Sequence, residues 1–289
     1  MSADEKRGSV VRRILLGSRL RQLRESRAIT REAAGYSIRA SESKISRMEL
    51  GRVGFKTRDV EDLLTLYGVT DEKERADLLG LAREANTAGW WHAFNSVVPS
   101  WFPNYVGLET AAARITAFEV QFVHGLLQTE AYAQAVITRG VRGPNVTRET
   151  IDDKVALRLE RQKKLVAENP LKLHAILDQG AVSRHYGGRE VMLAQLDHLI
   201  EMSEHPNVTL QVLPFSHGPH TAETGAFSVL SFPEPDLGDI IYAEQLTGAL
   251  YLDKPEEVSQ YTEVMESLIR DCPSPAKSVD YLRDWRRAC

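Results

Sequence analysis

The stretch from residue 29 to residue 51, ITREAAGYSIRASESKISRMELG, decides the fold of the N-terminal part of this chain. Thr30 and Ser41 are residues that commonly cap the start of a helix, because a side-chain hydroxyl can accept a hydrogen bond from a free backbone N–H. Good helix formers follow each of them, and a short break falls around Arg39 and Ala40. The stretch therefore predicts two short helices joined by a turn.

The second of these helices is polar on its outer faces. Ile45 and Met48 stand three positions apart and face inward. The positions left facing outward are Glu42, Ser43, Lys44, Ser46 and Arg47. This is the layout of a helix-turn-helix, and a short polar helix can present donors and acceptors to base edges in a major groove. Double-stranded DNA is therefore the first partner to expect.

Length and composition favour a two-domain protein. The chain has 289 residues, of which 43% are hydrophobic and 26% are charged, values typical of a folded soluble chain. Its sequence contains no run near the roughly 20 apolar residues that span a bilayer, and no apolar signal core at the start. Cys272 and Cys289 lack metal-ligand spacing. We expect a cytoplasmic, nucleoid-associated protein with reduced cysteines and no membrane partner.

Charge is distributed unevenly along the chain. Residues 1–70 carry 15 Lys or Arg against 9 Asp or Glu, whereas the remainder carries 21 against 31. The net charges are therefore +6 and −10. A basic head on an acidic body suits a phosphate-binding module joined to a module of another kind, although charge also fluctuates by chance along any chain.

Apolar periodicity extends the helical region on both sides of the opening stretch. A first helix is expected over residues 10–27, a fourth over 58–67 and a fifth over 71–85. Five helices within residues 1–85 predict a compact all-α helix-turn-helix head. Residues 86–108 then form a connector rich in aromatic residues and proline, which we expect to pack against the second domain.

Residues 109–289 are expected to form an α+β domain with a small β-sheet, serving regulation, dimerisation and partner binding. Short β-branched or aromatic runs predict strands at 171–177, 208–213, 226–232 and 239–243. Helical patterns are found at 109–122, 129–138, 148–168, 189–204 and 255–270.

Residues 17–68 resemble the Xre family, the lambda and 434 repressor-like helix-turn-helix domains, most specifically at Ile45-Ser46-Arg47-Met48-Glu49-x-Gly51. The resemblance implies that Arg24 of the first helix pairs with Glu49 and braces the two helices. It implies base contacts by Arg31, Glu42, Ser43 and Arg47, and phosphate contacts by Thr30, Lys44, Ser46, Arg52 and Lys56.

The chemistry of the outward side chains leaves more than one interpretation open. Arg47 can chelate a guanine, and Glu42 can accept from a cytosine amine, orient Arg47 or Lys44, or reject wrong sequences. A solvated helix face is the alternative for each of them. Arg39 stands in the turn where the family often has glycine, so a left-handed conformation there would cost roughly 1 kcal/mol and re-aim the second helix slightly.

The second domain resembles an actinobacterial domain of unknown function found behind Xre heads, over about residues 90–285. The motifs are Glu109, Glu119, the run Gly125-Leu-Leu-Gln-Thr-Glu-x-Tyr-Ala133, Arg158-Leu-x-Arg-Gln162 and Val208-Thr-Leu-Gln-Val-Leu-Pro214. His124 replaces the proline usual before the first run. Proteins of this kind are WhiJ-like developmental regulators or antitoxin-like regulators, so the resemblance implies a small regulatory partner protein, BldB-like or from a related acidic family.

Residue patterns give little support to catalysis or metal binding. His217 and His220, with His205, Glu223, Asp236 and Asp239 in the same region, lack the helical presentation and general base of a zinc hydrolase. Ser183 and Ser216 lack a nucleophile-elbow context, and no glycine-rich phosphate loop is present. We expect no enzyme activity, catalytic residue, metal or cofactor.

Aromatic residues of the connector, Trp90, Trp91, Trp101 and Phe102, are the candidate interface between chains. Taken together, the sequence predicts a sequence-specific transcriptional regulator, expected to be a repressor, that binds DNA as a homodimer. One alternative is an antitoxin-type protein that sequesters a partner and autoregulates. Another is a small-molecule sensor or enzyme that uses a pocket of the second domain.

Overall fold

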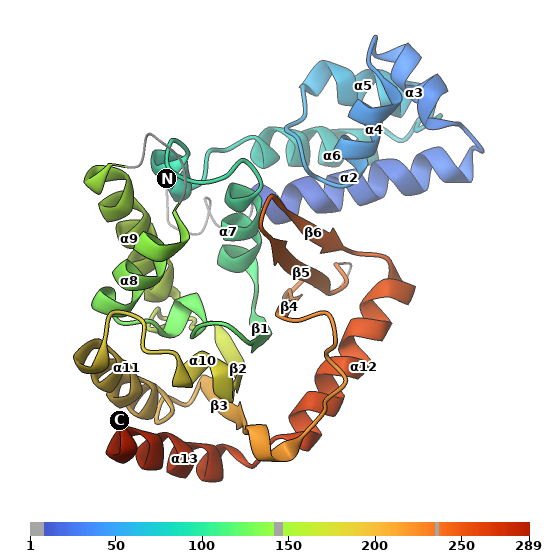
Figure 1. The fold of residues 1–289 in the computed structure, drawn as a ribbon. Coiled ribbons are helices and arrows are strands. Elements are labelled where there is room, and N and C mark those ends of the chain that lie inside the picture. The colour runs from blue at the N-terminus through green and yellow to red at the C-terminus, as the bar shows by residue number, and fades with distance from the viewer. Residues whose placement is uncertain (1–8, 142–146, 235–236) are drawn as a thin grey trace. The chain divides into compact units, whose positions relative to one another are not determined.

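A computed structural model describes residues 9–141, 147–234 and 237–289 of the chain (Figure 1). The chain divides into two compact units. Unit 1 comprises the described residues up to Ala93 together with Pro103–Ala111, and unit 2 comprises Phe94–Phe102 and the described part of Ala112–Cys289. The connector expected at residues 86–108 is thus shared between both units.

Unit 1 is built from helices. The opening stretch forms α3 (Arg31–Ser37) and α4 (Glu42–Glu49), and these lie among α2 (Ser9–Ser26), α5 (Thr57–Leu66) and α6 (Glu72–Ala85) (Figure 1). A further helix, α7 (Phe102–Ala111), follows a short 3₁₀ turn at Trp90–Phe94. The five-helix, all-α head predicted from the sequence is confirmed.

The core of unit 1 is formed by the apolar stripes of these helices, with members such as Leu20, Ile45, Met48 and Leu63. Gly17 allows α2 to approach α4 closely, because a Cβ at this position would lie only 2.4 Å from the carbonyl oxygen of Met48. The contact between α2 and α4 is therefore made backbone to backbone.

Unit 2 contains a six-stranded mixed sheet with the strand order β3-β2-β1-β4-β5-β6. The first three strands, β1 (Arg114–Glu119), β2 (Lys172–Asp178) and β3 (Val208–Leu213), are parallel. The others run antiparallel to their neighbours: β4 (Phe227–Ser231), β5 (Ile240–Gln245) and β6 (Gly248–Leu252). The α+β character predicted for this part of the chain is confirmed.

Helices cover both faces of this sheet. Helix α12 (Pro255–Asp271) packs Met265 and Leu268 against the face that carries Phe118 and Ile241. Figure 1 shows α8 (Glu130–Gly140), α9 (Arg148–Gln162) and α11 (Arg189–Met202) on the other side of the sheet from α12. The short helix α10 (Gln179–Ser183) follows β2, and α13 (Pro275–Ala288) closes the chain.

The helix predicted over residues 109–122 is wrong. Helix α7 ends at Ala111, and Arg114–Glu119 forms the strand β1 at the centre of the sheet, paired with both β2 and β4. Alanine and glutamate favour a helix locally, but pairing on both sides prevails over that preference. The predicted helix over 148–168 ends earlier, at Gln162, and continues as a 3₁₀ turn. The four predicted strands are confirmed to within two residues, while β6 and α13 were not predicted.

Candidate DNA-binding surface

The two helices of the opening stretch begin where their capping residues predict. The hydroxyl of Thr30 accepts from the N–H of Ala33 (3.1 Å), and the hydroxyl of Ser41 accepts from the N–H of Lys44 (3.3 Å). Each bond satisfies one of the backbone donors left open at a helix start. The local sequence thus fixes where α3 and α4 begin.

The turn between α3 and α4 depends on two residues. Arg39 has a φ of 55°, which confirms that an arginine occupies the left-handed position, at a cost of roughly 1 kcal/mol. The N–H of Ala40 donates to the carbonyl of Gly35 (2.8 Å), and a Cβ on Gly35 would lie 2.7 Å from the carbonyl oxygen of Ala40. The turn is therefore tight enough to exclude a side chain at Gly35.

A buried ion-pair network holds α4 against α2 and α3. Glu49, at the end of α4, is 4% exposed and accepts from Arg24 at Oε1 (2.5 Å) and Oε2 (3.2 Å). Arg24 is 6% exposed and also donates to the carbonyl of Ile29 (2.8 Å). The hydrogen bond to Glu49 raises the pKa of the Arg24 guanidinium above its usual value. The pairing of Arg24 with Glu49 is present as the resemblance implied.

Arg31 is a third member of this network. Its Nε donates to Glu49 Oε2 at 2.9 Å, and its side chain is partly exposed. The sequence placed Arg31 among the base-contacting residues. In this structure its guanidinium is instead paired with Glu49, the last residue of α4. We define Arg24, Arg31 and Glu49 as the brace.

The outward face of α4 presents the side chains that the sequence assigned to DNA. Glu42, Ser43 and Arg47 are exposed, while Ile45 and Met48 point into the core. The guanidinium Nε of Arg47 donates to the carbonyl of Ser43 (3.3 Å), one turn earlier. The three polar groups thus form a contiguous surface on one side of the helix.

The residues assigned to phosphates surround this face. Thr30, Arg52 and Lys56 are exposed and Ser46 is half-buried. Lys44 is half-buried and its Nζ lies 2.6 Å from Asp59 Oδ2 on α5. That ion pair was not predicted, because Asp59 is 15 positions further along the chain and belongs to another helix.

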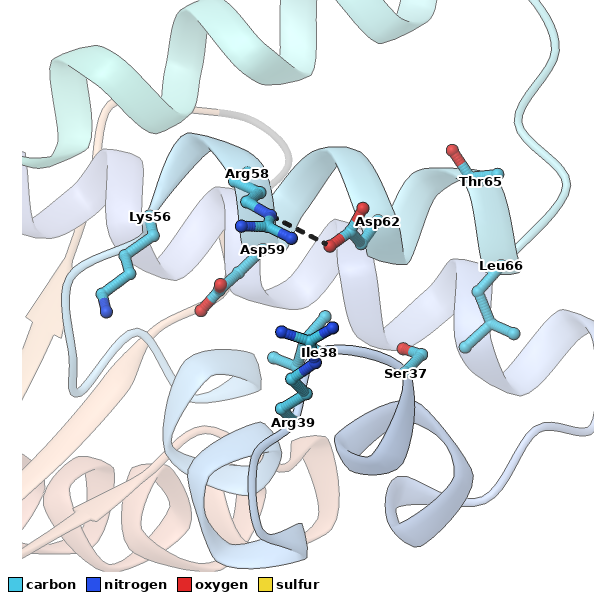
Figure 2. Close-up of a pocket in the computed structure, with 9 residues that line it drawn as sticks. All are labelled: Ser37, Ile38, Arg39, Lys56, Arg58, Asp59, Asp62, Thr65 and Leu66. Carbon is cyan, nitrogen blue, oxygen red and sulfur yellow. Dashed lines mark ion pairs between the residues drawn. The ribbon is translucent and has the colours of Figure 1, made fainter.

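An open cavity of about 580 Å³ lies between the turn and α5 (Figure 2). Arg39, Lys56 and Arg58 bring three cationic side chains to it, together with Asp59 and Asp62. Arg58 pairs with Asp62 at 3.9 Å. Cationic side chains beside α4 suit a phosphate backbone, and sequence patterns alone did not identify Arg39 and Arg58 as part of this surface.

The candidate interface residues of the connector differ in their surroundings. Trp91 is 2% exposed and packs closely on two glycines. A Cβ on Gly89 would lie 2.3 Å from the Trp91 ring, and a Cβ on Gly107 would lie 3.0 Å from it. Trp91 is therefore a core residue of unit 1, which corrects its assignment to an exposed interface. Trp90 is half-buried and meets the Trp91 ring edge to face.

The other two aromatic residues belong to unit 2 and contact other residues of that unit. The carbonyl of Trp101 accepts from the hydroxyl of Tyr251 on β6 (2.8 Å), and the guanidinium of Arg161 lies 5.3 Å from the ring centre of Phe102. Both side chains are half-buried. Their assignment to an interface between chains stays a prediction.

Two motifs of the second domain, the run Gly125–Ala133 and Arg158–Gln162, meet in one hydrogen-bond network. Gln128 donates to the carbonyl of Val123 (2.6 Å) and accepts from Arg158 on α9 (2.6 Å). Gln162, also on α9, donates to the carbonyls of Gly125 (3.0 Å) and Gln128 (2.8 Å). The two motifs are thus structural partners, with α9 fixing the loop before α8.

Gln195 of α11 completes this network from a fully buried position. Its side-chain amide donates to the carbonyl of Leu127 (2.7 Å) and accepts from the N–H of Thr129 (2.8 Å). Thr129 in turn caps α8. We define Gln128, Gln162 and Gln195 as the amide network. The sequence carried no signal for Gln195, which lies 66 residues beyond Thr129.

Glu119 stands near this network at the end of β1. Burial raises the pKa of its carboxyl group to about 8, Arg158 and Arg161 act in the opposite direction, and Glu244 adds to the rise. Glu109, the other acidic residue of the motif set, is a buried residue of α7 in unit 1.

The residues considered for metal binding do not converge. Across the described ranges, no group of three or more His, Cys, Asp or Glu side chains could hold a metal ion. Asp236 lies outside the described residues. In the same ranges, no helix combines the length and apolar character that crossing a membrane requires. Cys272 and Cys289 are free thiols.

Comparison with known proteins identifies two regions. A model of a helix-turn-helix domain matches residues 15–78, and a model described as a domain of unknown function (DUF5753) matches residues 102–284. The second match covers more than half of the chain, so the chain belongs to the DUF5753 family. No match was found among curated proteins or among solved structures.

Proposed function

We propose that this helix-turn-helix member of the DUF5753 family is a sequence-specific transcriptional regulator of the Xre type that reads the major groove with α4. The observation that carries the proposal is the exposed polar face of Glu42, Ser43 and Arg47 on α4, a helix capped by Ser41. The brace fixes the angle of this face from beneath. A rigid support is what specific base contacts require.

Each residue of the surface has a proposed role. Arg47 chelates a guanine, Ser43 and Glu42 contact neighbouring base edges, and Arg31 reaches DNA once its bond to Glu49 is exchanged for one to a base or phosphate. The surrounding residues position the protein on the backbone through phosphate contacts: Thr30, Lys44, Ser46, Arg52 and Lys56.

The regulator is proposed to bind its operator as a homodimer and to act as a repressor. One helix-turn-helix contacts only a few base pairs, so two heads spaced about one helical turn apart are needed for an operator's usual specificity. Analytical ultracentrifugation with and without operator DNA measures the stoichiometry. Two chains per operator supports the proposal, and one chain contradicts it.

Unit 2 is proposed to act by binding a small regulatory partner protein of the BldB type or a related acidic family. The likeness of its motifs to WhiJ-like and antitoxin-like regulators supports this, and so does the use of motif residues in backbone hydrogen bonds rather than around a reactive group. Co-purification of the tagged chain from its host, followed by mass spectrometry, identifies the partner, and growth with the partner alone distinguishes regulation from antitoxin activity.

The DNA-reading role is tested with Arg47→Ala. After selection of a preferred duplex from a random library, we expect the variant to lose about 1–3 kcal/mol of affinity and to relax its sequence preference. Fluorescence anisotropy at fixed salt measures both. Arg83→Ala is the matched control, because Arg83 is an exposed arginine on α6 of the same unit. Equal losses in both variants, or none in either, would remove Arg47 from the interface.

A further inference from the structure

A second cavity, of about 540 Å³, lies in unit 2 at the carboxyl ends of the parallel strands. Val120 directly follows β1, Asp178 ends β2 and Leu213 ends β3. Residues of the β3–β4 loop, 214–226, line the remaining side of this open cavity. Parallel sheets commonly bind ligands in the crevice beyond the carboxyl ends of their strands, and this volume suits a small organic molecule.

The charged side chains around the cavity are acidic. Asp178 and Glu223 supply two carboxylates, and the described residues that line the cavity include neither lysine nor arginine. His220 also lines the cavity, and its Nδ1 accepts from the N–H of Ala222 (3.2 Å). One guanidinium, that of Arg184, is bonded to the carbonyl of Val120, which also lines the cavity. Within the described ranges, two carboxylates against this one cation leave the site net negative, so it favours a cation over an anion.

Asp178 is held in position by the helix that follows β2. Its Oδ1 accepts from the N–H of Gly180 (2.6 Å) and caps α10. Arg184, at the other end of α10, donates to the carbonyl of Val120 (3.1 Å). The carboxylate of Asp178 is thus preorganised by its own backbone contact.

The other walls are apolar, and one carries an exposed aromatic ring. Leu213, Pro214 and Pro219 line the cavity, and Phe215 is 61% exposed beside them. The backbone N–H of Phe215 donates to Gln179 Oε1 (2.8 Å), which fixes the start of the loop. An aromatic face near carboxylates is the combination that binds organic ammonium ions, through cation–π attraction and charge.

We propose that this cavity is a binding site for a small organic ammonium ion with an apolar or aromatic body. Asp178 and Glu223 receive the ammonium group, and Phe215 with Leu213 and the two prolines contacts the apolar body. The inference goes beyond DNA recognition and stands on unit 2 alone, so it holds or fails independently of the role proposed for α4.

The test uses the full chain, with 2-phenylethylammonium as the probe. Ligand-observed NMR titration at pH 7 measures the Kd. We expect a Kd of about 1 mM, binding of the neutral 2-phenylethanol at least about fivefold weaker, and weaker binding still for phenylacetate. Asp178→Asn combined with Glu223→Gln should weaken ammonium binding by about tenfold. Asparagine retains the capping bond to α10.

Two further variants keep the test decisive. Phe215→Ala changes a residue of an exposed loop and should weaken binding by about threefold through loss of the cation–π contact. Glu204→Gln, an equal charge change at an exposed residue after α11, should leave the Kd unchanged. Phenylacetate binding as tightly as the ammonium ion, no ammonium binding at about 20 mM, or equal loss in Glu204→Gln would overturn the proposal.

Discussion

The two units use buried polar groups in different ways. The brace of unit 1 is ionic, because Glu49 accepts from Arg24 and Arg31, and one of these arginines remains partly exposed. The amide network of unit 2 pairs the neutral side chains of Gln128, Gln162 and Gln195 with backbone groups. The ionic network positions a helix beside solvent, whereas the amide network locks a loop inside the unit.

Because of this difference, we expect a change in the brace to cost more unfolding free energy than a change in the amide network. A buried charge that loses its partner is strongly destabilising. Loss of the neutral Gln195 amide leaves only the backbone groups of Leu127 and Thr129 unpaired. An ionic brace also leaves positive charge at the edge of the surface that would meet phosphates. In unit 1, one residue that supports α4, Arg31, therefore also carries partly exposed positive charge beside the proposed DNA-binding face.

Breaking the brace should give the largest effect. Glu49→Ala leaves the buried charge of Arg24 without its main partner, so we expect unit 1 to lose about 3–5 kcal/mol of unfolding free energy. Hydrogen-exchange mass spectrometry of α2–α4 in urea measures the loss within the full chain. Glu61→Ala, at an exposed position of α5, is the control and should stay within about 0.5 kcal/mol.

A double variant tests whether the cost of breaking the brace comes from the unpaired charge. Arg24→Met combined with Glu49→Leu replaces both charges by apolar groups of similar size and should recover most of the stability lost in Glu49→Ala. If the double variant is as unstable as the single one, hydrogen-bond geometry rather than an uncompensated charge dominates the cost.

Breaking the amide network should cost less. Gln195→Ala removes the partners of the Leu127 carbonyl and the Thr129 N–H, and we expect a loss of about 1–3 kcal/mol in unit 2. Exchange of the α8 amides reports it. Gln134→Ala, the same change at an exposed site of α8, should have little effect. A loss as large as that of Glu49→Ala would mean that neutral and ionic networks are equivalent here.

The parts of the fold that depend on local chemistry were predictable. Thr30, Ser41, Asp71 and Thr129 start their helices as expected, because capping involves only the next few residues. The strand β1 was not predictable in this way, because its pairing partners are distant in the sequence. Strand β2 lies more than 50 residues away and β4 more than 100. Nothing within Arg114–Glu119 itself records those neighbours.

In the candidate site, too, local features were predictable and contacts between separate helices were not. The exposed face of α4 follows from the spacing of Ile45 and Met48, and the pairing of Arg24 with Glu49 followed from the family resemblance. The pairing of Glu49 with a second arginine, Arg31, and the pairing of Lys44 with Asp59 depend on how separate helices pack. Sequence spacing therefore predicted which residues of α4 are exposed, but not which ion pairs its charged residues form.

The smallest effect should come from the ion pair at the edge of the proposed DNA-binding face of α4. Asp59→Asn releases Lys44 from a partly exposed pair, so unfolding free energy should change by less than about 1 kcal/mol. Removing a carboxylate beside phosphate-binding cations should strengthen DNA binding about threefold at low salt. Asp77→Asn, an equal charge change at an exposed site of α6, is the control. Asp59 pairs with Lys44, so a matching gain in both variants would assign the effect to net charge. No gain in either would place Lys44 away from the phosphates.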